Sequence, residues 1–120
     1  GTVGIIIISG WVAVNPDNRS KALEDARPFM EKTRAREGCL DYTWCADELI
    51  PERIYVYERW ASEEALKGHF ASDPFVQMRT AIAAHGITGL DVSKHRVDLS
   101  EPVYDPTGTP RADFYTAEDS

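Results

Sequence analysis

Residues 57–70, YERWASEEALKGHF, decide the fold because they contain the end of one regular element and the start of the next. The segment YERW ends a run of aromatic and β-branched residues that is typical of a strand. Ser62 is a preferred helix N-cap residue, and Glu63 and Glu64 suit the positive end of the helix dipole. The stretch therefore predicts a strand, a tight cap and a helix, with His69 on the helix stripe that faces the interior.

The residues before this stretch predict an antiparallel hairpin. The segments CLDYTWCA at 39–46 and RIYVYERW at 53–60 are strand-like, and the polar link DELIPE between them is short. Alternation along the second strand puts one set of side chains on one face and a second set on the other. The first set is Val56, Glu58 and Trp60, and the second is Tyr55, Tyr57 and Arg59.

Further from the stretch, the pattern predicts two more strands and two more helical segments. GIIIISGWVAV at 4–14 is a β-branched strand, and residues 17–36 carry apolar side chains on one helical face. Asp73-Pro74 interrupts and restarts the second helix, and LDVSKHRVDL at 90–99 is a weaker fourth strand. The order β-α-β-β-α-β predicts an α+β, ferredoxin-like fold with a four-stranded antiparallel sheet.

The chain of 120 residues has room for one domain, which we expect over residues 1–99. Residues 100–120 are rich in Pro, Thr and acidic residues, and we expect them to form a C-terminal arm without its own core. Both faces of the first strand are apolar, and exposed apolar patches usually mark interfaces. The pattern therefore predicts a homodimer that packs through its sheet faces.

Composition excludes several classes of partner. With 13 Lys+Arg against 20 Asp+Glu, the formal charge of −7 disfavours nucleic acid. No apolar run approaches the ~20 residues of a membrane helix, and no signal-peptide pattern precedes Ile5, so we expect a soluble cytoplasmic protein. Cys39 and Cys45 fall on one strand roughly 20 Å apart and are expected to be reduced. The histidine and cysteine spacing gives little support for a metal site.

Two motifs carry a family resemblance. TRAREGCLDY at 33–42 and YVYERWASEEALKGHFASDPF at 55–75 resemble the antibiotic biosynthesis monooxygenase (ABM) superfamily of dimeric α/β barrels, and within it the quinol-monooxygenase-like proteins. The resemblance covers roughly residues 5 to 99. It implies a pocket between sheet and helices in each subunit, in which many members oxidise phenols, quinols or anthrones with dioxygen. Such members use neither metal nor flavin, so no cofactor is expected.

The resemblance suggests roles for two candidate catalytic residues. His69 would accept a phenolic proton, because an imidazole titrates near neutral pH. Arg79 follows the apolar face of its helix and would hold an anionic oxygen. Each also has a purely structural interpretation: a buried histidine often bridges backbone groups, and an arginine can extend to solvent or pair with an acid such as Glu58.

Four more residues are candidates for substrate binding. Trp60 and Tyr57 are the aromatic residues most suited to contact a planar ligand, although alternation puts them on opposite faces. Tyr42 belongs to the same aromatic hairpin, whose other members are expected in the core or the dimer interface. Glu58 is an acid in an apolar strand, so it must be paired, for example with an arginine, or have a perturbed pKa.

Haem degradation, which also occurs in the superfamily, is disfavoured. Haem-degrading members use a strand-one Asn, a helix-two Trp and an iron-ligating His. At those places this chain offers Gly10, His69 and Arg79, and an arginine cannot ligate iron.

Three functions therefore remain open from the sequence. The first is a cofactor-independent monooxygenase that acts on a small aromatic quinol, phenol or anthrone-like substrate with dioxygen. The second is an isomerase or lyase of a small keto or lactone compound on the same scaffold. The third is a non-catalytic dimer that binds a hydrophobic metabolite.

Overall fold

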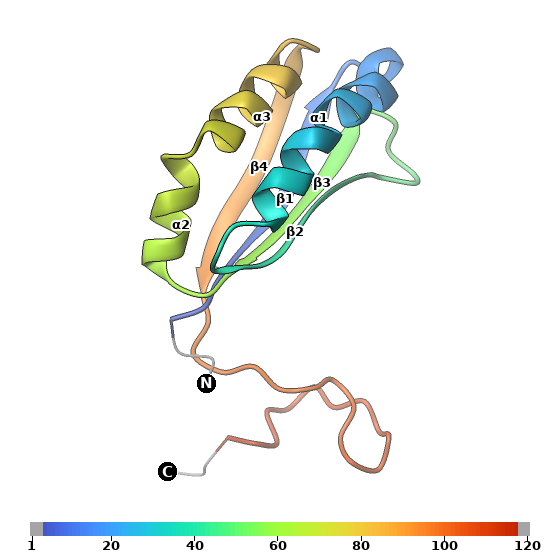
Figure 1. Cartoon of the computed structure of the whole chain (residues 1–120). Helices are drawn as coiled ribbons and strands as arrows, with labels where there is room; N and C mark the ends of the chain where they lie inside the picture. The colour runs from blue at the N-terminus through green and yellow to red at the C-terminus, as the bar shows by residue number, and fades with distance from the viewer. Residues whose placement is uncertain (1–3, 118–120) are drawn as a thin grey trace.

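Four antiparallel strands form one sheet in the computed structural model, which describes residues 4–117 (Figure 1). The strand order is β2-β3-β1-β4, and helices cover one face of the sheet (Figure 1). The strands are β1 Ile6–Val14, β2 Cys39–Ala46, β3 Arg53–Trp60 and β4 Ile87–Arg96. The helical segments are η1 Pro16–Asn18, α1 Arg19–Arg34, α2 Glu63–Phe70 and α3 Asp73–Ala83. This arrangement is the predicted ferredoxin-like α+β fold.

The predicted elements are confirmed with small shifts at their ends. The hairpin strands β2 and β3 have the predicted bounds, whereas β4 begins three residues earlier than expected and ends at Arg96. The early start follows from pairing with β1, because Ile87 is the partner of Val14 beyond a register shift at Ala13. A β-branched residue with a paired neighbour extends the strand even where the local sequence pattern is weak.

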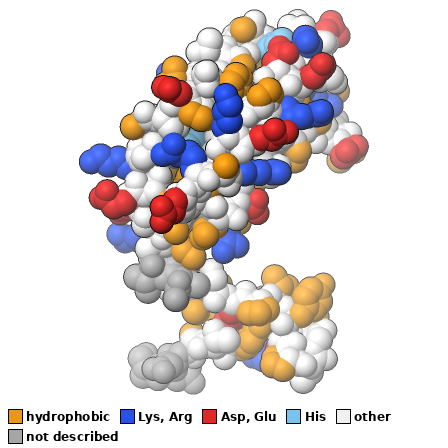
Figure 2. Space-filling view, in the orientation of Figure 1, with side chains coloured by type: hydrophobic (Ala, Val, Ile, Leu, Met, Phe, Trp, Pro, Cys, Tyr) orange, Lys and Arg blue, Asp and Glu red, His pale blue; other side chains and the backbone are white. Residues whose placement is uncertain are grey.

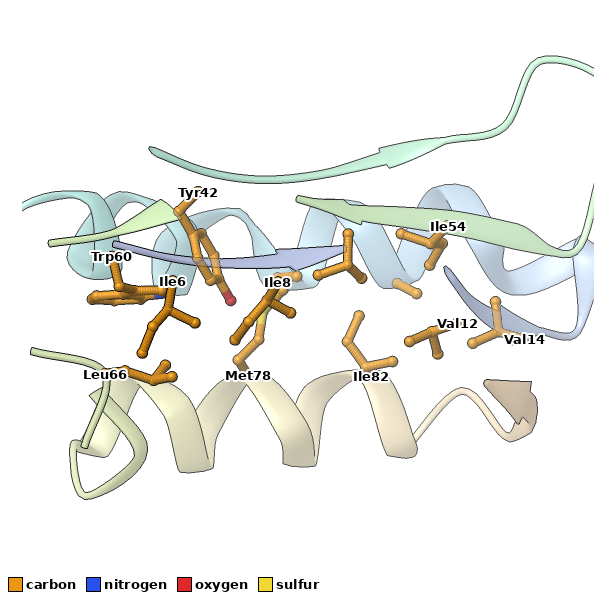
Figure 3. Packing of buried hydrophobic residues seen from close by; sticks show 13 residues of the cluster. Ile6, Ile8, Val12, Val14, Tyr42, Ile54, Trp60, Leu66, Met78 and Ile82 are labelled. Atoms are coloured by element: carbon orange, nitrogen blue, oxygen red, sulfur yellow. The ribbon is translucent and has the colours of Figure 1, made fainter. Parts of the chain in front are cut away.

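The core lies between the sheet and the helices. Ile6, Ile8 and Val12 of β1 point toward the helices, where Leu66, Met78 and Ile82 meet them (Figure 3). Their register partners on β3 are Trp60, Glu58 and Ile54, so the predicted face of β3 also points into this layer. Glu58 therefore places a carboxyl group among buried apolar side chains, where acidic residues are rarely found.

A serine caps the start of α2 and another caps the start of α3, where the two helices are separated. The hydroxyl of Ser62 accepts a hydrogen bond from the backbone N–H of Ala65 at 3.1 Å, as the sequence predicts. The hydroxyl of Ser72 accepts one from the N–H of Phe75 at 3.4 Å and donates one to the carbonyl of His69 at 2.6 Å. The second cap therefore ties the start of α3 to the residue that carries the imidazole.

The sheet of a single chain is open and does not close into a barrel. A dimeric α/β barrel would need the sheet of a second chain, so the dimer remains a prediction. The face away from the helices carries Trp11, Tyr55 and Tyr57, and Tyr55 is exposed while the other two are half-buried. This is the face that the apolar pattern of the first strand assigns to an interface.

The segment after β4 extends away from the sheet (Figure 1). It has a polar framework: the carboxylate of Glu101 accepts hydrogen bonds from the backbone N–H groups of Tyr115 and Thr116, at 3.1 and 3.0 Å. Hydrophobic side chains of the arm, among them Tyr104 and Phe114, are exposed (Figure 2). The division into a domain at 1–99 and an arm at 100–120 remains a prediction, and residues 118–120 lie outside the described chain.

Candidate functional site

A cavity of about 640 Å³ lies between the sheet and α3. Its walls come from all four strands, from the end of α2 and from the length of α3. The lining is mostly apolar and aromatic, with Ile8, Val12, Trp44, Val56, Phe70, Phe75, Ile82, Leu90 and Val92 among its residues. Its size and composition are those of a pocket for a small, flat organic molecule.

Glu58 supplies the carboxyl group in this lining. The alternation of β3 turns its side chain toward the helices, and the residue is only 6% exposed. The indole Nε1 of Trp60 donates a hydrogen bond to Glu58 Oε1 at 3.0 Å. Burial disfavours the charged carboxylate and raises the pKa of Glu58 to about 7, against the opposing effect of the Trp60 hydrogen bond. Glu58 can therefore bind and release a proton near neutral pH.

His69 lies behind Glu58 and is not part of the cavity lining. Its ring is 1% exposed and stacks on Trp60, with ring centroids 4.5 Å apart. Tyr42 and Phe75 contact it edge-on at centroid distances of 5.8 and 5.2 Å. Burial, followed by the positive charge of Arg36, lowers the pKa of His69 to about 4. The imidazole is therefore neutral at pH 7.

The two side chains face each other across a short gap. His69 Nε2 lies 3.9 Å from Glu58 Oε1, and His69 Nδ1 is buried without a hydrogen-bond partner within residues 4–117. The gap exceeds a hydrogen-bond distance, but such contacts often shorten when a ligand fills the site. Glu58 is thus held by Trp60 on one oxygen and has an imidazole within reach of the same carboxyl.

Arg79 lines the opposite part of the cavity from α3. Its guanidinium lies over the ring of Phe75, 5.6 Å from the ring centroid, and the side chain is exposed. The structure forms no ion pair between Arg79 and Glu58, so the pairing considered from the sequence is absent from this arrangement. The guanidinium of Arg79 thus lies at the cavity without a carboxylate of Glu58 beside it, where an anionic oxygen could meet it.

The structure separates the predicted aromatic residues. Trp60 and Tyr42 are fully buried and contact His69, so they form the support behind Glu58 and not the cavity surface. Tyr57 lies on the opposite face of the sheet and is not brought to the cavity, because it follows Val56 in the alternation of β3. Burial raises the pKa of the Tyr42 hydroxyl well above its usual value, so this group stays protonated.

Sequence reasoning missed Trp44 as an aromatic wall of the cavity. The register with β3 reveals its position: Tyr42 pairs with Glu58, and Trp44 pairs with Val56 on the same face. Its indole Nε1 is buried and has no hydrogen-bond partner within the described residues.

Potential metal and haem ligands are not gathered at this site. Within residues 4–117 no group of three His, Cys, Asp or Glu side chains is placed to hold a metal ion. Gly10 leaves no space for a side chain, since a Cβ there would lie 2.0 Å from the carbonyl oxygen of Asp91. None of the helices in the described part is long and apolar enough to cross a membrane.

Comparisons with known proteins place this arrangement in a known group. The family model described as antibiotic biosynthesis monooxygenase matches residues 5–81. The uncharacterised protein sll1783 of Synechocystis is 29% identical over 70 residues, which are 58% of this chain and 48% of that protein. The Bacillus subtilis protein YcnE, a proposed monooxygenase, is 29% identical over 66 residues, which are 54% of this chain and 68% of that protein. The chain thus spans about half the length of the Synechocystis relative.

Solved structures share the fold. A proposed antibiotic biosynthesis monooxygenase from Deinococcus radiodurans superposes with a TM-score of 0.74 at 19% identity, over 83% of this chain and 99% of that one. A similar protein from Caulobacter crescentus gives 0.70 at 23% identity, over 83% and 93% of the two chains. A conserved protein from Methanosarcina mazei gives 0.71 at 22% identity, over 79% and 94%.

Proposed function

Because the chain belongs to the antibiotic biosynthesis monooxygenase family, we propose that it is a cofactor-independent monooxygenase. Its substrate would be a small aromatic quinol, phenol or anthrone-like compound, and dioxygen would be the oxidant. The observation that carries this proposal is the apolar cavity of about 640 Å³ with one buried carboxyl group, Glu58, in its wall. A mostly apolar cavity with a single carboxyl group suits the formation of an electron-rich phenolate.

Glu58 is the proposed base. A carboxyl group whose pKa is about 7 is closer in pKa to a phenol than an ordinary glutamate is, so it accepts the phenolic proton more readily. The resulting phenolate is a strong enough electron donor to react with dioxygen. Arg79, on the same cavity, would stabilise the negative charge that develops on oxygen.

The overall reaction balances without any added reductant. A phenol and one dioxygen molecule give a quinone and one water: one oxygen atom enters the ring and the other leaves as water. The substrate supplies all four electrons that dioxygen takes up. Proton transfers complete the step, and Glu58 can carry them because its two protonation states are both accessible near pH 7.

His69 is proposed as a positioning residue, because it contacts Glu58 and not the cavity. A neutral imidazole 3.9 Å from Oε1 can hydrogen-bond to the protonated or the ionised carboxyl after a small movement. Trp60 and Tyr42 hold the imidazole in place through the ring contacts described above. In this proposal Tyr57 has no role in the cavity.

An isomerase or lyase of a keto or lactone compound is a second candidate, since a single buried base can move a proton without redox chemistry. The same observation, the Glu58 carboxyl in an apolar wall, supports it. Anaerobic incubation separates the two functions, because only the monooxygenase requires dioxygen.

The test is oxygen consumption with a panel of hydroquinones and naphthols. We expect turnover by the wild type and a loss of at least about 100-fold in Glu58→Gln, in line with the contribution of a general base. Glu48→Gln is the matched control, because Glu48 is exposed in the β2–β3 link and should leave the rate unchanged. Equal turnover by Glu58→Gln and wild type would remove the proposed base.

We also propose a homodimer through the uncovered face of the sheet, which carries Trp11, Tyr55 and Tyr57. Burying large apolar side chains favours association by about 1.5–3 kcal/mol each. Sedimentation at micromolar concentration should give a dimer for the wild type and a monomer for Tyr55→Glu. Leu49→Glu, a similar change in the exposed β2–β3 link, should remain dimeric, and a monomeric wild type would contradict the proposal.

A further inference from the structure

A second cavity of about 590 Å³ adjoins the candidate site. It lies where the start of β1, the end of β4 and helix α2 meet. Phe70 and Lys94 line both cavities, so the two spaces are neighbours that share one wall. A ligand longer than a single ring could therefore occupy the main cavity and extend past these two residues into the second.

The floor of the second cavity is apolar and its rim is basic. Ile6, Leu66 and Phe70 form the apolar part, while Lys67, Lys94 and Arg96 provide cationic side chains. Lys94 and Arg96 are the register partners of Ile8 and Ile6, so their side chains lie on the helix side of the sheet. Two alternate residues of one strand thus present positive charge to the same space.

These three cations have few carboxylates to neutralise them. Glu63 is the acidic residue in the lining of the second cavity. Within residues 4–117 no ion pair joins Lys67, Lys94 or Arg96 to an acidic group. The basic cluster contrasts with the net charge of −7 of the whole chain, which on average repels anions. An apolar floor beneath a charge also strengthens its attraction for a partner of opposite sign.

We propose that the substrate is an aromatic acid, whose ring lies in the main cavity beside Glu58 and whose carboxylate lies in the second cavity on Lys94, Lys67 and Arg96. The inference rests on the proposed function for the ring and its hydroxyl. It adds the chemical class of the substrate: a phenolic or quinol ring with a carboxylate at the end away from the reacting hydroxyl. Lys94 has the central role because it borders both spaces.

Binding can be measured independently of oxidation. The probes are 6-hydroxy-2-naphthoate and its neutral carboxamide, which differ only in the charge at one end. Anaerobic titration calorimetry with the wild-type chain should give at least about tenfold tighter binding of the acid. Lys94→Met should remove most of this difference without changing the affinity for the carboxamide, and Arg96→Met should reduce it.

The control is Lys32→Met, which makes the same change on α1, away from both cavities, and should preserve the preference for the acid. Raising the salt concentration should weaken binding of the acid more than binding of the amide. Equal affinities of the wild type for acid and amide, or an unchanged preference in Lys94→Met, would overturn the inference.

Oxygen consumption distinguishes this inference from the proposed function. If neutral quinols are oxidised while the acid has no advantage in binding, the inference fails and the monooxygenase stands. If the acid binds through Lys94 but neither probe consumes oxygen, the anion site stands and the monooxygenase fails.

Discussion

Trp60 donates its indole N–H to the carboxyl of Glu58, two residues before it on the same face of β3, over 3.0 Å. The same indole stacks on His69. One buried side chain therefore orients both the carboxyl group in the cavity wall and the imidazole behind it. The acid-base properties of the site depend on these three residues together.

Replacing the indole should change the pH at which Glu58 titrates. The Trp60 hydrogen bond lowers the pKa of Glu58, so Trp60→Phe, which removes the donor, should raise that pKa further. The pH profile of kcat/KM should move to higher pH. Trp11→Phe, on the uncovered face of the sheet, is the control and should leave the profile in place. A profile unchanged in Trp60→Phe would show that the hydrogen bond does not act on the reacting group.

The activity itself should depend on the ionisation of Glu58. Because a base must be deprotonated to accept a proton, kcat/KM should rise with pH and level off above a pKa of about 7. In Glu58→Gln this rise should disappear along with most of the rate. His69 has a pKa of about 4, so it should contribute no change between pH 6 and 8. If the pH profile of kcat/KM in Glu58→Gln keeps a midpoint near 7, the titrating group is not Glu58.

Glu58 and His69 should have opposite effects on stability between about pH 4.5 and 6.5. The folded-state pKa of Glu58 is raised from 4.5 to about 7, so its contribution is full below 4.5 and is lost as pH rises toward 7. The folded-state pKa of His69 is lowered from 6.5 to about 4, so its contribution is full above 6.5 and is lost as pH falls toward 4. In this pH range folding takes up a proton at Glu58 and releases one at His69, so the two effects on stability nearly cancel in the wild type.

Urea unfolding across this pH range tests the cancellation. The free energy of unfolding of the wild type should change little from these two groups. The free energy of unfolding of Glu58→Gln should fall by roughly 3 kcal/mol at most as the pH is lowered, because the His69 effect remains. His69→Gln should instead lose stability toward neutral pH. Parallel curves for all three proteins would contradict the opposing shifts.

Two Gly→Ala substitutions should have opposite signs. At Gly10, with φ of +151°, a new Cβ would lie 2.0 Å from the carbonyl oxygen of Asp91, so β4 must move away from β1. Gly10→Ala should destabilise the chain by about 2 kcal/mol or more. Gly68 lies inside α2, where the nearest atom to a new Cβ is the tip of the Arg36 side chain at 3.4 Å. Gly68→Ala should be neutral or stabilising by up to about 1 kcal/mol in thermal or urea unfolding.

The sequence predicted the hairpin and the two faces of β3 well, because β3 alternates clearly and a short link joins it to β2. It also placed His69 inside. It included Glu58 among the candidate substrate-binding residues, but it assigned the base to His69, which does not line the cavity. That distinction depends on the distance and angle at which α2 and α3 pack on the sheet, which no local pattern encodes. Trp44 was missed for a different reason, since its face follows only from the register with β3.

Ser72, the N-cap of α3, separates two parts of the site that differ in how freely their residues can be substituted. The base, the imidazole and the rings of Trp60 and Tyr42 lie on β2, β3 and α2, and Phe75 at the start of α3 also contacts His69. The hydrogen bond from Ser72 to the carbonyl of His69 holds this group together with the start of α3. The remaining part of the site comprises Arg79 on α3 and Leu90 and Lys94 on β4. None of these three residues contributes to the support of Glu58. Substitutions of Arg79, Leu90 or Lys94 can therefore alter which molecule is accepted while the groups that bind and release the proton stay unchanged.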